Sequence, residues 1–498
     1  MKFARPKVKP VSLGEIAKKF DLDSNVNDVK ITGITHNTKS VEPGDLFVAL
    51  SGEKNHGAQF VSEAIANGAS AVLTDDAGQN LIADKQIPVI STKNPRHLLG
   101  DLSSFVFGNP SHSLKVFGIT GTNGKTTSAW LMRSGLEKCG IPTSLLGTAG
   151  ISIAGTNLPS SRTTPEAPEL QALLALALEK GSKAISMEVS SHSLSLERVN
   201  GTKFACTGFT NLSQDHLDFH KNMEDYFSAK AKLFTKEFTS HAVITEVDKW
   251  GKKLSKQLTG IDFMTLGGDV HNDWRVSDIT AALGHVYFEL FDPRNKPYKV
   301  TLSFAGSFNA YNAALVIAMA DQIGVDTKEF ISGIKATQIP GRMQPVVMPG
   351  AALGIIDYAH SPEAIDNVLS ALRKQTFGKL IVVLGAGGNR DSEKRPFMGA
   401  SGEKYADQLI ITDDNPRDED PSQIRKAVLS GTKDKSKVVE IGNRAEAIKH
   451  AAQIATTDDT IAILGKGHET TQEIAGQVFD FDDAKHLEDA LKQRFGKL

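Results

Sequence analysis

The sequence predicts an α/β protein with three domains. Strand-like apolar runs at Lys115–Ile119 and Ala184–Val189 alternate with helical patterns at Thr126–Lys138 and Pro168–Lys180. This alternation is typical of a parallel sheet with crossover helices. A length of 498 residues also suits about three domains of roughly 150 residues each.

Two turn-rich stretches divide the chain into the predicted domains, which are 1–113, 114–344 and 345–498. Phe107–Ser113 is rich in turn-forming residues and is typical of a linker, and Pro340-Gly-Arg ends the second segment. The third segment repeats the strand pattern three times, at Lys379–Leu384, Gln408–Thr412 and Thr460–Leu464. Gly or Asp residues follow each strand, as expected where the carboxyl ends of parallel strands face a ligand.

The composition is that of a soluble globular protein. Apolar residues make up 40 % and charged residues 23 %, and the net charge of −2 argues against a nucleic-acid-binding surface. The basic N-terminus lacks the apolar stretch of a signal peptide, and no apolar run approaches the roughly 18 residues that span a membrane. Cys139 and Cys206 fit neither a zinc site nor a disulfide framework, which favours a buried free thiol. We expect a monomeric cytoplasmic protein without a nucleic-acid partner or membrane insertion.

The strongest local signal is the stretch from Val116 to Thr127, in which an apolar run enters a glycine-rich turn that ends in Gly-Lys-Thr. A helical pattern follows, and Gly140 is its expected stop. Glycines let backbone N–H groups surround phosphate oxygens, the lysine adds a positive charge and the Thr126 hydroxyl can bind Mg²⁺. The glycine spacing differs from a standard Walker A loop. We interpret the following residues as an ATP-binding loop: Gly121, Thr122, Asn123, Gly124, Lys125, Thr126 and Thr127.

This loop spacing, G-x-x-G-x-x-G-K-T, resembles that of the Mur ligase family, and the resemblance extends over nearly the whole chain. Further landmarks of the family follow in order: Met187–His192, Thr210–His216, Gly306–Asn309, Gly341-Arg342 and Asp357–His360. Members are three-domain ligases that activate a carboxylate as an acyl phosphate and then form an amide. Asn37–Lys39, Gly44–Ala49, Thr163–Pro165 and Asp414–Arg417 are similar to the branch that extends UDP-MurNAc-L-Ala-D-Glu.

The resemblance implies a distinct task for each domain. The N-terminal domain would bind the UDP-precursor, the central domain would be a P-loop ATPase-like parallel-sheet domain, and the C-terminal domain would be a Rossmann-like α/β domain for the amino acid. The reaction would be ATP-dependent addition of meso-diaminopimelate to UDP-MurNAc-L-Ala-D-Glu, with Mg²⁺ as cofactor. The small-molecule partners would be the UDP-MurNAc-dipeptide, diaminopimelate and ATP.

Four residues are candidates for catalysis: Lys125, Glu188, His216 and Lys230. Glu188 ends a strand-like run, where a carboxylate can reach Mg²⁺ held at Thr126. The resemblance makes His216 a second-metal ligand, although a histidine in a polar loop is more often solvated. It also makes Lys230 a carbamate that binds the metal through oxygen, although a lysine on a solvated helix face is the ordinary alternative.

The resemblance assigns further nucleotide contacts to Asn309, Arg342 and Asp357, for which a helix cap, a surface arginine and a turn aspartate are the alternatives. Leu196 replaces a glutamine that close relatives often have near the precursor. The candidates for precursor binding are Thr38, Lys39, Thr163, Thr164, Ser190 and Arg198.

The third domain contains Gly385–Arg390, which lacks the last glycine of a dinucleotide-binding fingerprint. The resemblance instead assigns the incoming amino acid to Arg390, Asp414, Asn415, Pro416, Arg417, Gly465 and Glu469. Two guanidinium groups and one carboxylate suit a diamino dicarboxylic acid better than lysine. Alternatively, Arg417 forms a surface salt bridge with the acidic run Asp418–Asp420.

Other functions stay open at this point. A lysine-adding ligase would differ at Arg417, and a folylpolyglutamate synthetase would lack the substrate segment Asn37–Ala49. A non-catalytic nucleotide-binding regulator would be expected to lose Lys125, Glu188 or Lys230. A P-loop kinase would phosphorylate its substrate without requiring an amine.

Overall fold

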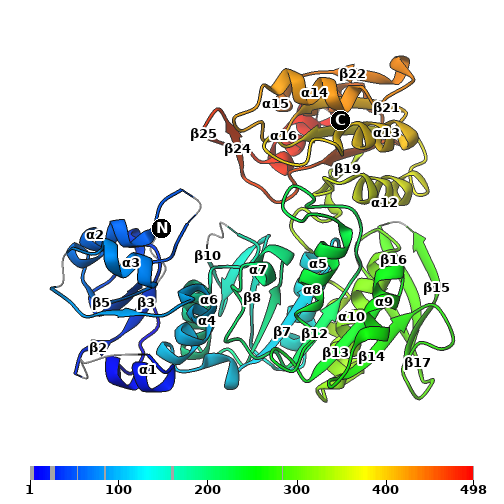
Figure 1. Ribbon diagram of the computed structural model, residues 1–498. Coiled ribbons are helices and arrows are strands. Elements are labelled where there is room, and N and C mark those ends of the chain that lie inside the picture. Colours follow the sequence, from blue (N-terminus) through cyan, green and yellow to red (C-terminus); the bar gives the residue numbers. More distant parts are fainter. Residues whose placement is uncertain are drawn as a thin grey trace.

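A computed structural model of the chain describes residues 5–22, 28–52, 54–83, 86–158, 162–282 and 284–496. Its three main sheets follow one another along the sequence, and Figure 1 shows each as a separate unit. The N-terminal unit (blue) lies beside the central unit (cyan to green), and the C-terminal unit (yellow to red) lies above the central one. The α/β fold with parallel sheets is therefore confirmed.

The N-terminal unit contains a parallel sheet in the order β3-β4-β5-β6. Its strands are β3 (Gly33–Thr35), β4 (Asp45–Val48), β5 (Ala69–Thr74) and β6 (Val89–Ser91), and its helices are α1 (Leu13–Lys19), α2 (Val61–Ala66), α3 (Asp76–Leu81) and α4 (Pro95–Val106). Pro95 begins α4, and the Asn94 side chain accepts a hydrogen bond from His97 N, so a cap and a proline fix the start of this helix. Leu99 and Leu102 of α4 share a hydrophobic cluster with Ala175 of the central unit, which joins the two units.

The central sheet has eleven strands, and β7 lies between β11 and β12 near its middle. Six neighbouring strands run parallel to one another: β8 (Thr143–Gly147), β11 (Ala184–Glu188), β7 (Lys115–Thr120), β12 (Cys206–Phe209), β13 (His241–Thr245) and β14 (Asp262–Gly267). The next strand, β15 (Trp274–Ala282), also pairs parallel with β14. At one edge of the sheet, β9 (Gly150–Ile153) and β10 (Thr156–Leu158) form an antiparallel hairpin. At the other edge, an antiparallel meander extends the sheet; its strands are β15, β16 (His285–Phe291) and β17 (Pro297–Leu302). The sequence reasoning did not predict this meander.

Helices cover both faces of the central sheet. One hydrophobic cluster contains α5 (Lys125–Lys138), α10 (Asn309–Gln322) and α11 (Thr327–Ile334), and the other contains α6 (Ala167–Glu179), α8 (Met223–Ala231) and α9 (Lys249–Gln257). Burial on both faces explains why β7 and β11 read as continuous apolar runs. The predicted strands and helices of this segment are confirmed within two residues, and Gly140 follows α5 with φ of 72°. Both cysteines are free thiols, and Cys206 is buried whereas Cys139 is only half-buried.

The C-terminal unit contains a six-stranded sheet in the order β18-β19-β23-β20-β21-β22. Its strands are β18 (Gln344–Val346), β19 (Leu353–Asp357), β23 (Thr460–Leu464), β20 (Leu380–Ala386), β21 (Gln408–Asp413) and β22 (Val438–Glu440), and only β18 is antiparallel. Its helices are α12 (Pro362–Arg373), α13 (Arg395–Tyr405), α14 (Pro421–Leu429), α15 (Arg444–Ile454) and α16 (Asp483–Phe495), and the short hairpin β24–β25 (Thr471–Ile474, Gln477–Asp480) follows β23. The three predicted strands match β20, β21 and β23.

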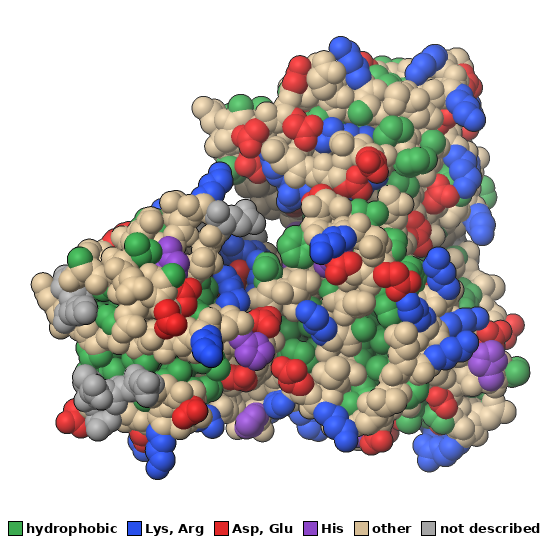
Figure 2. Space-filling view, in the orientation of Figure 1, with side chains coloured by type: hydrophobic (Ala, Val, Ile, Leu, Met, Phe, Trp, Pro, Cys, Tyr) green, Lys and Arg blue, Asp and Glu red, His purple; other side chains and the backbone are tan. Residues whose placement is uncertain are grey.

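Figure 2 shows an opening between the N-terminal unit at the left and the C-terminal unit at the top, above the central unit. Charged side chains lie along its edges. No helix among the described residues is long and apolar enough to cross a membrane.

Candidate active site

The glycine-rich loop lies at the carboxyl edge of the central sheet, between β7 and α5. Gly121 and Gly124 have φ values of 149° and 88°, which are unfavourable for other residues. A Cβ atom at Gly121 would also overlap the Thr210 hydroxyl, and one at Gly124 would overlap the Asn312 side chain. The loop therefore needs these glycines, and it presents the free N–H groups at the start of α5 to the carboxyl edge, where an anion can bind.

Two lysines meet inside this loop. Lys125 Nζ donates to the carbonyl oxygens of Gly121 and Thr122, both at 2.9 Å, and Lys230 Nζ donates to the same Gly121 oxygen at 2.9 Å. Lys230 is only 1 % exposed, so its interpretation as a lysine on a solvated helix face was wrong. Burial lowers the pKa of both lysines, and the positive charge of Lys125 lowers that of Lys230 further. An anionic oxygen beside them would favour their charged forms.

Glu188 ends β11 next to the loop and is buried. Thr148 holds both of its oxygens, because Thr148 N donates to Oε1 at 2.8 Å and Thr148 Oγ1 donates to Oε2 at 3.1 Å. The hydroxyl of Thr126, at the start of α5, accepts a hydrogen bond from Arg342 Nη2 at 3.0 Å. Glu188 and Thr126 thus offer oxygen atoms beside the phosphate loop.

His216 adopts a left-handed backbone conformation with φ of 56°, and its side chain is 38 % exposed. Its ring meets His192 edge to face, with the ring centroids 4.8 Å apart. Burial lowers the pKa of His216 to about 3 against the opposing effect of Asp215, so the imidazole is neutral and has a lone pair available for a metal.

The fit of these groups to Mg²⁺ is mixed. A carboxylate and a hydroxyl supply the oxygen ligands that Mg²⁺ prefers, whereas the imidazole nitrogen of His216 suits it less well. Among the described residues, no three His, Cys, Asp or Glu side chains gather in a metal-binding arrangement. Such a site would therefore need oxygens from phosphate and water, as is usual for Mg²⁺ bound with a nucleotide.

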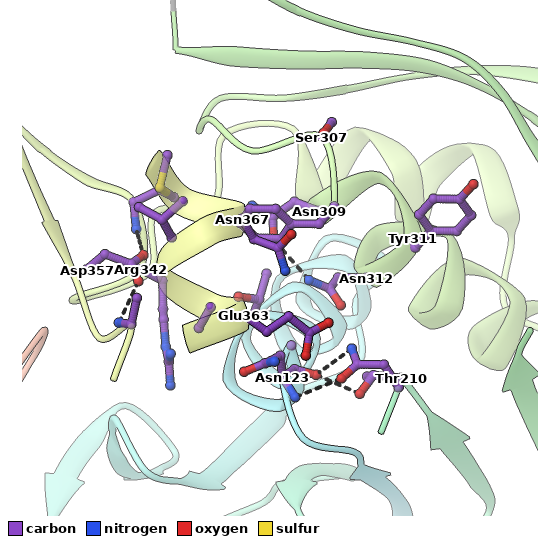
Figure 3. Close-up of a pocket in the computed structure, with 18 of the residues that line it drawn as sticks. Asn123, Thr210, Ser307, Asn309, Tyr311, Asn312, Arg342, Asp357, Glu363 and Asn367 are labelled. Atoms are coloured by element: carbon purple, nitrogen blue, oxygen red, sulfur yellow. Dashed lines mark hydrogen bonds between the residues drawn. The ribbon is translucent and has the colours of Figure 1, made fainter. Parts of the chain in front are cut away.

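A cavity of about 350 Å³ opens beside the loop, between the central and C-terminal units. Figure 3 shows Arg342 and Asp357 on one side of it, Tyr311 on the other and Asn123 at its base. Residues from α10 and from α12 line it as well, so both units form its walls. Its position against the phosphate loop suits the remainder of a nucleotide.

The three predicted nucleotide contacts all line this cavity. Asn309 is the first residue of α10 but makes no capping hydrogen bond; its amide donates to Ala305 O at 2.8 Å, and its oxygen accepts from Asn312. The two carboxylate oxygens of Asp357 accept from Met343 N at 2.7 Å and Ala359 N at 2.8 Å, and burial raises the pKa of this carboxyl. Arg342 lies over the ring of Tyr358, with 4.6 Å from its Cζ to the ring centroid. It is not a free surface arginine.

Three contacts join the C-terminal unit to the catalytic edge of the central unit. Arg342 reaches Thr126, His468 Nε2 lies 2.8 Å from Thr148 O, and Lys394 Nζ lies 3.5 Å from Asp215 Oδ1. Thr126 belongs to the phosphate loop, and Thr148 is the hydrogen-bond partner of Glu188. Asp215 directly precedes His216. The C-terminal unit is thus docked directly over the phosphate loop.

The predicted precursor-binding residues lie in three places. Thr163, Thr164 and Ser190 meet at the carboxyl end of β11, where Thr164 Oγ1 donates to Glu188 O at 2.9 Å and accepts from Ser190 N at 3.1 Å. Thr38 and Lys39 lie on the N-terminal unit, in the 3-10 helix η1 (Thr38–Ser40).

Arg198, the remaining candidate for precursor binding, is engaged by a carboxylate at the boundary between these units. Its Nε atom lies 2.8 Å from Glu166 Oε1, and Arg96 Nη1 lies 3.1 Å from the second oxygen. A substrate anion at Arg198 would therefore compete with Glu166.

The predicted amino-acid residues gather at the carboxyl ends of β20, β21 and β23. Asn415 Nδ2 donates to Glu469 Oε2 at 2.8 Å, and Gly465, with φ of 112°, leaves room for the buried Asp414 carboxylate. Pro416 lies against Gly388, where a Cβ atom would overlap the Pro416 carbonyl. Burial raises the pKa of Glu469.

The two arginines of this group differ. Arg417 Nη1 donates to Gly388 O at 2.6 Å and its Nε lies 3.4 Å from Glu473 Oε2, so its ion pair is with the β24 strand and not with Asp418–Asp420. Arg395 instead forms an ion pair with Glu419 of that acidic run, with 2.9 Å between Arg395 Nη1 and Glu419 Oε2. The alternative of a salt bridge within the acidic run was therefore wrong. Arg390 is exposed and donates to its neighbour Asn389 O at 3.1 Å.

Sequence reasoning missed Lys466, Thr148 and Lys394. Lys466 is fully buried, and its ammonium donates to Asn415 Oδ1 at 3.0 Å, Glu469 Oε2 at 3.2 Å and Thr471 O at 2.6 Å. Its setting between two glycines directly after the apolar strand β23 was an available signal, because ligands bind outside the carboxyl ends of the strands in such sheets. Thr148 and Lys394 carry no such signal.

Comparison with known proteins agrees with this arrangement. The chain matches models of the Mur ligase family catalytic domain over residues 30–106, the Mur ligase middle domain over 119–320 and the Mur ligase glutamate ligase domain over 341–467. It is 40 % identical over 497 residues to the UDP-N-acetylmuramoyl-L-alanyl-D-glutamate–2,6-diaminopimelate ligase of Streptomyces avermitilis, covering 98 % of each chain.

Two solved structures extend the comparison. One of a UDP-N-acetylmuramoyl-L-alanyl-D-glutamate–2,6-diaminopimelate ligase matches with a TM-score of 0.68 and 30 % identity, covering 97 % of this chain and 99 % of that one. One of the MurF ligase of Thermotoga maritima in complex with ADP matches with a TM-score of 0.65 and 20 % identity, covering 93 % and 98 % of the two chains, and this likeness shows the fold alone. With all three units matched in order and a relative this similar along its full length, the chain belongs to the Mur ligase family.

Proposed function

We propose that this protein is an ATP-dependent ligase that adds meso-diaminopimelate to UDP-MurNAc-L-Ala-D-Glu, with release of ADP and phosphate. The observation that carries this proposal is that Arg342 and His468 dock the C-terminal unit, which carries the candidate amino-acid residues, onto the edge of the central sheet that holds the phosphate loop. A ligase of this kind needs both sites close together, because the acyl phosphate made at one must meet the amine held at the other. The names of the similar proteins support the choice of substrates.

In this proposal the phosphate loop and the adjoining cavity bind ATP. The adenosine moiety occupies the cavity with Asn309 and Asp357, and the phosphates lie on the N–H groups at the start of α5. Lys125 leaves its loop carbonyls for the phosphates, and Arg342 adds a second positive charge from the C-terminal unit. Such fixed charges are the main contribution of a protein to phosphoryl transfer.

Mg²⁺ is the proposed cofactor, and Thr126 and Glu188 are the residues best suited to hold it. His216 and a carbamate on Lys230 are further proposed ligands. When bound, the ion neutralises phosphate charge and helps to orient the terminal phosphate. Thr148 fixes the Glu188 carboxylate for this task through both of its oxygens.

The chemistry proceeds in two displacements. The γ-carboxylate of the D-Glu residue attacks the γ-phosphorus of ATP, so that a carboxyl O–P bond forms and the bond to ADP breaks. The amine of diaminopimelate then attacks the acyl carbon, the C–O bond to phosphate breaks, and the nitrogen loses a proton. Exclusion of water protects the acyl phosphate between the steps.

The amino acid is proposed to bind at the carboxyl ends of β20, β21 and β23. Glu469 faces an ammonium group of the substrate, and Arg390 and Arg417 face its carboxylates. Arg417 would exchange its present partner Glu473, at 3.4 Å, for the distal carboxylate that lysine lacks.

The remaining assignments complete the proposal. The segments 1–113, 114–344 and 345–498 act as the precursor, ATP and amino-acid domains of a cytoplasmic monomer. Thr38, Lys39, Thr163, Thr164, Ser190 and Arg198 hold the UDP-MurNAc-dipeptide.

A phosphate-release assay with every combination of ATP, UDP-MurNAc-L-Ala-D-Glu and a panel of amines tests this function. We expect release to require all three substrates, and mass spectrometry to find a product that joins the precursor and diaminopimelate. A phosphorylated precursor formed without any amine would favour a kinase, and an absence of release in every mixture would favour a nucleotide-binding regulator. Either result would overturn the proposal.

A further inference from the structure

The turn that follows β23 makes contacts at two sites. On one side, Lys466 and Glu469 contact Asn415 in the proposed amino-acid site. On the other side, His468 Nε2 lies 2.8 Å from the carbonyl oxygen of Thr148 in the central unit. Only one residue separates Lys466 from His468, so the turn connects the proposed amino-acid site to the edge of the phosphate site.

The direction of the His468 hydrogen bond is fixed by its acceptor. A carbonyl oxygen can only accept, so Nε2 carries the proton and Nδ1 does not. Burial lowers the pKa of His468 to about 4, which keeps this neutral form at physiological pH. Nδ1 is buried without a hydrogen-bond partner among the described residues, so Nε2 makes the polar contact of this ring.

Thr148 transmits the contact to Glu188. Its N–H and hydroxyl groups donate to the two oxygens of the Glu188 carboxylate at 2.8 and 3.1 Å. The orientation of that carboxylate therefore depends on the position of Thr148. A Cβ atom at Gly147 would overlap Glu188 Oε1, which shows how closely the backbone is packed on the carboxylate. The Thr148 hydroxyl also lies 2.9 Å from Thr163 Oγ1.

The turn itself is held rigidly on the C-terminal unit. Lys466 is 0 % exposed and donates to three acceptors. Gly467 packs closely on Gly341, and a Cβ atom at Gly341 would overlap the backbone of the turn. Gly341 adjoins Arg342, which reaches the Thr126 hydroxyl. A shift of the C-terminal unit would therefore move His468 away from Thr148.

We propose that His468 is a positioning residue that orients the Glu188 carboxylate through Thr148, so that docking of the amino-acid-binding unit completes the metal site. This inference rests on the proposed function, because it takes Glu188 as the ligand of a divalent cation bound with the nucleotide. Partners that orient a ligand in this way typically contribute about 10- to 100-fold to metal affinity. The proposed amino-acid site and the phosphate site are thus mechanically joined by one turn.

The test measures Mn²⁺ binding in the presence of ADP by the loss of the free-ion electron paramagnetic resonance signal. The variants are His468→Ala, which removes the donor, and His468→Gln, whose amide N–H can still donate. We expect His468→Ala to bind Mn²⁺ about 10-fold more weakly than wild type, and His468→Gln to stay within about threefold. Affinity for ADP without metal should be unchanged in both.

His271→Ala serves as the matched control, because this histidine of the central unit lies on the surface with its side chain 66 % exposed. Thr148→Val, which loses only the hydroxyl donor to Glu188, should weaken Mn²⁺ binding in the same way as His468→Ala, and Thr148→Ser should not. Wild-type affinity in His468→Ala would overturn the inference, and so would a His468→Gln variant as weak as His468→Ala. The assay contains neither precursor nor amine, so failure of the ligation reaction itself would be seen separately in the wild-type enzyme.

Discussion

Lys125 and Lys230 donate to the same atom, the carbonyl oxygen of Gly121, each at 2.9 Å. The two residues are more than 100 positions apart in the sequence, and one begins α5 while the other lies in the last turn of α8. Both side chains lie beside the phosphate loop, and burial lowers the pKa of each. The two lysines have separate, testable roles.

Lys125→Ala should abolish most turnover while the fold is retained. The variant loses a charge that faces the phosphate in the transition state, and one such electrostatic contact is worth about 10²–10³ in kcat. Phosphate release gives the rate, and circular dichroism with thermal melting checks the fold. Lys138→Ala is the control, because Lys138 is an exposed lysine at the other end of the same helix. Comparable turnover in Lys125→Ala and wild type would refute the assignment of the loop.

Lys230 should be carbamylated in the active enzyme. Its pKa is lowered well below the ordinary lysine value by burial and then by Lys125, which favours the neutral amine that attacks CO₂. The N–C bond forms with loss of one proton, and the product is an anion. We expect Lys230→Ala to lose activity and to regain part of it with short-chain carboxylates.

Lys232→Ala, two residues further on, should behave like wild type. Intact-protein mass spectrometry after trapping of the carbamate measures the modification directly. An unmodified Lys230 in fully active enzyme prepared with bicarbonate would contradict this prediction.

Arg444→Met should destabilise the C-terminal unit. Arg444 and Asp483 form a fully buried pair with two hydrogen bonds of 2.7 Å, which ties α15 to α16 beside the proposed amino-acid site. Removal of one partner leaves a buried charge unpaired, which typically costs about 3–5 kcal/mol. Urea unfolding followed by fluorescence measures the change, with Lys492→Ala as an exposed control on α16. An unchanged unfolding midpoint in Arg444→Met would show that the pair is not important for stability.

The sequence was most informative where one local pattern determines the structure. The loop from Gly121 to Thr127 predicted its strand, turn and helix correctly, because glycines at positive φ and a helix start leave few alternatives. The strands at 379–384, 408–412 and 460–464 were equally clear, because strands buried on both faces are continuously apolar. The antiparallel meander β15–β17 was not foreseen, since nothing in its composition fixes which edge it joins.

The site was less predictable where it depends on contacts between distant residues. Lys230 sits in an ordinary charged helix, and only the packing of α8 under the loop makes it buried. Thr148 contacts Glu188, which is 40 residues away in the sequence, and His468, which is 320 residues away. No local sequence pattern predicts such contacts. Lys466 could have been found from its position after a central strand, but its three acceptors could not.

The choice of amino acid tests the account most directly, by measurement of kcat/KM for diaminopimelate and lysine with the wild type and with Arg417→Ala. Arg417 is half-buried between Gly388 and Glu473, and with lysine bound it would lack the substrate carboxylate that we assign to it. We predict that wild type prefers diaminopimelate by about 10²-fold or more, because a guanidinium left without its anion is costly, and that Arg417→Ala loses most of this preference. Equal values for the two amines in the wild type would contradict the proposed specificity, and no ligation of either amine would contradict the proposed function.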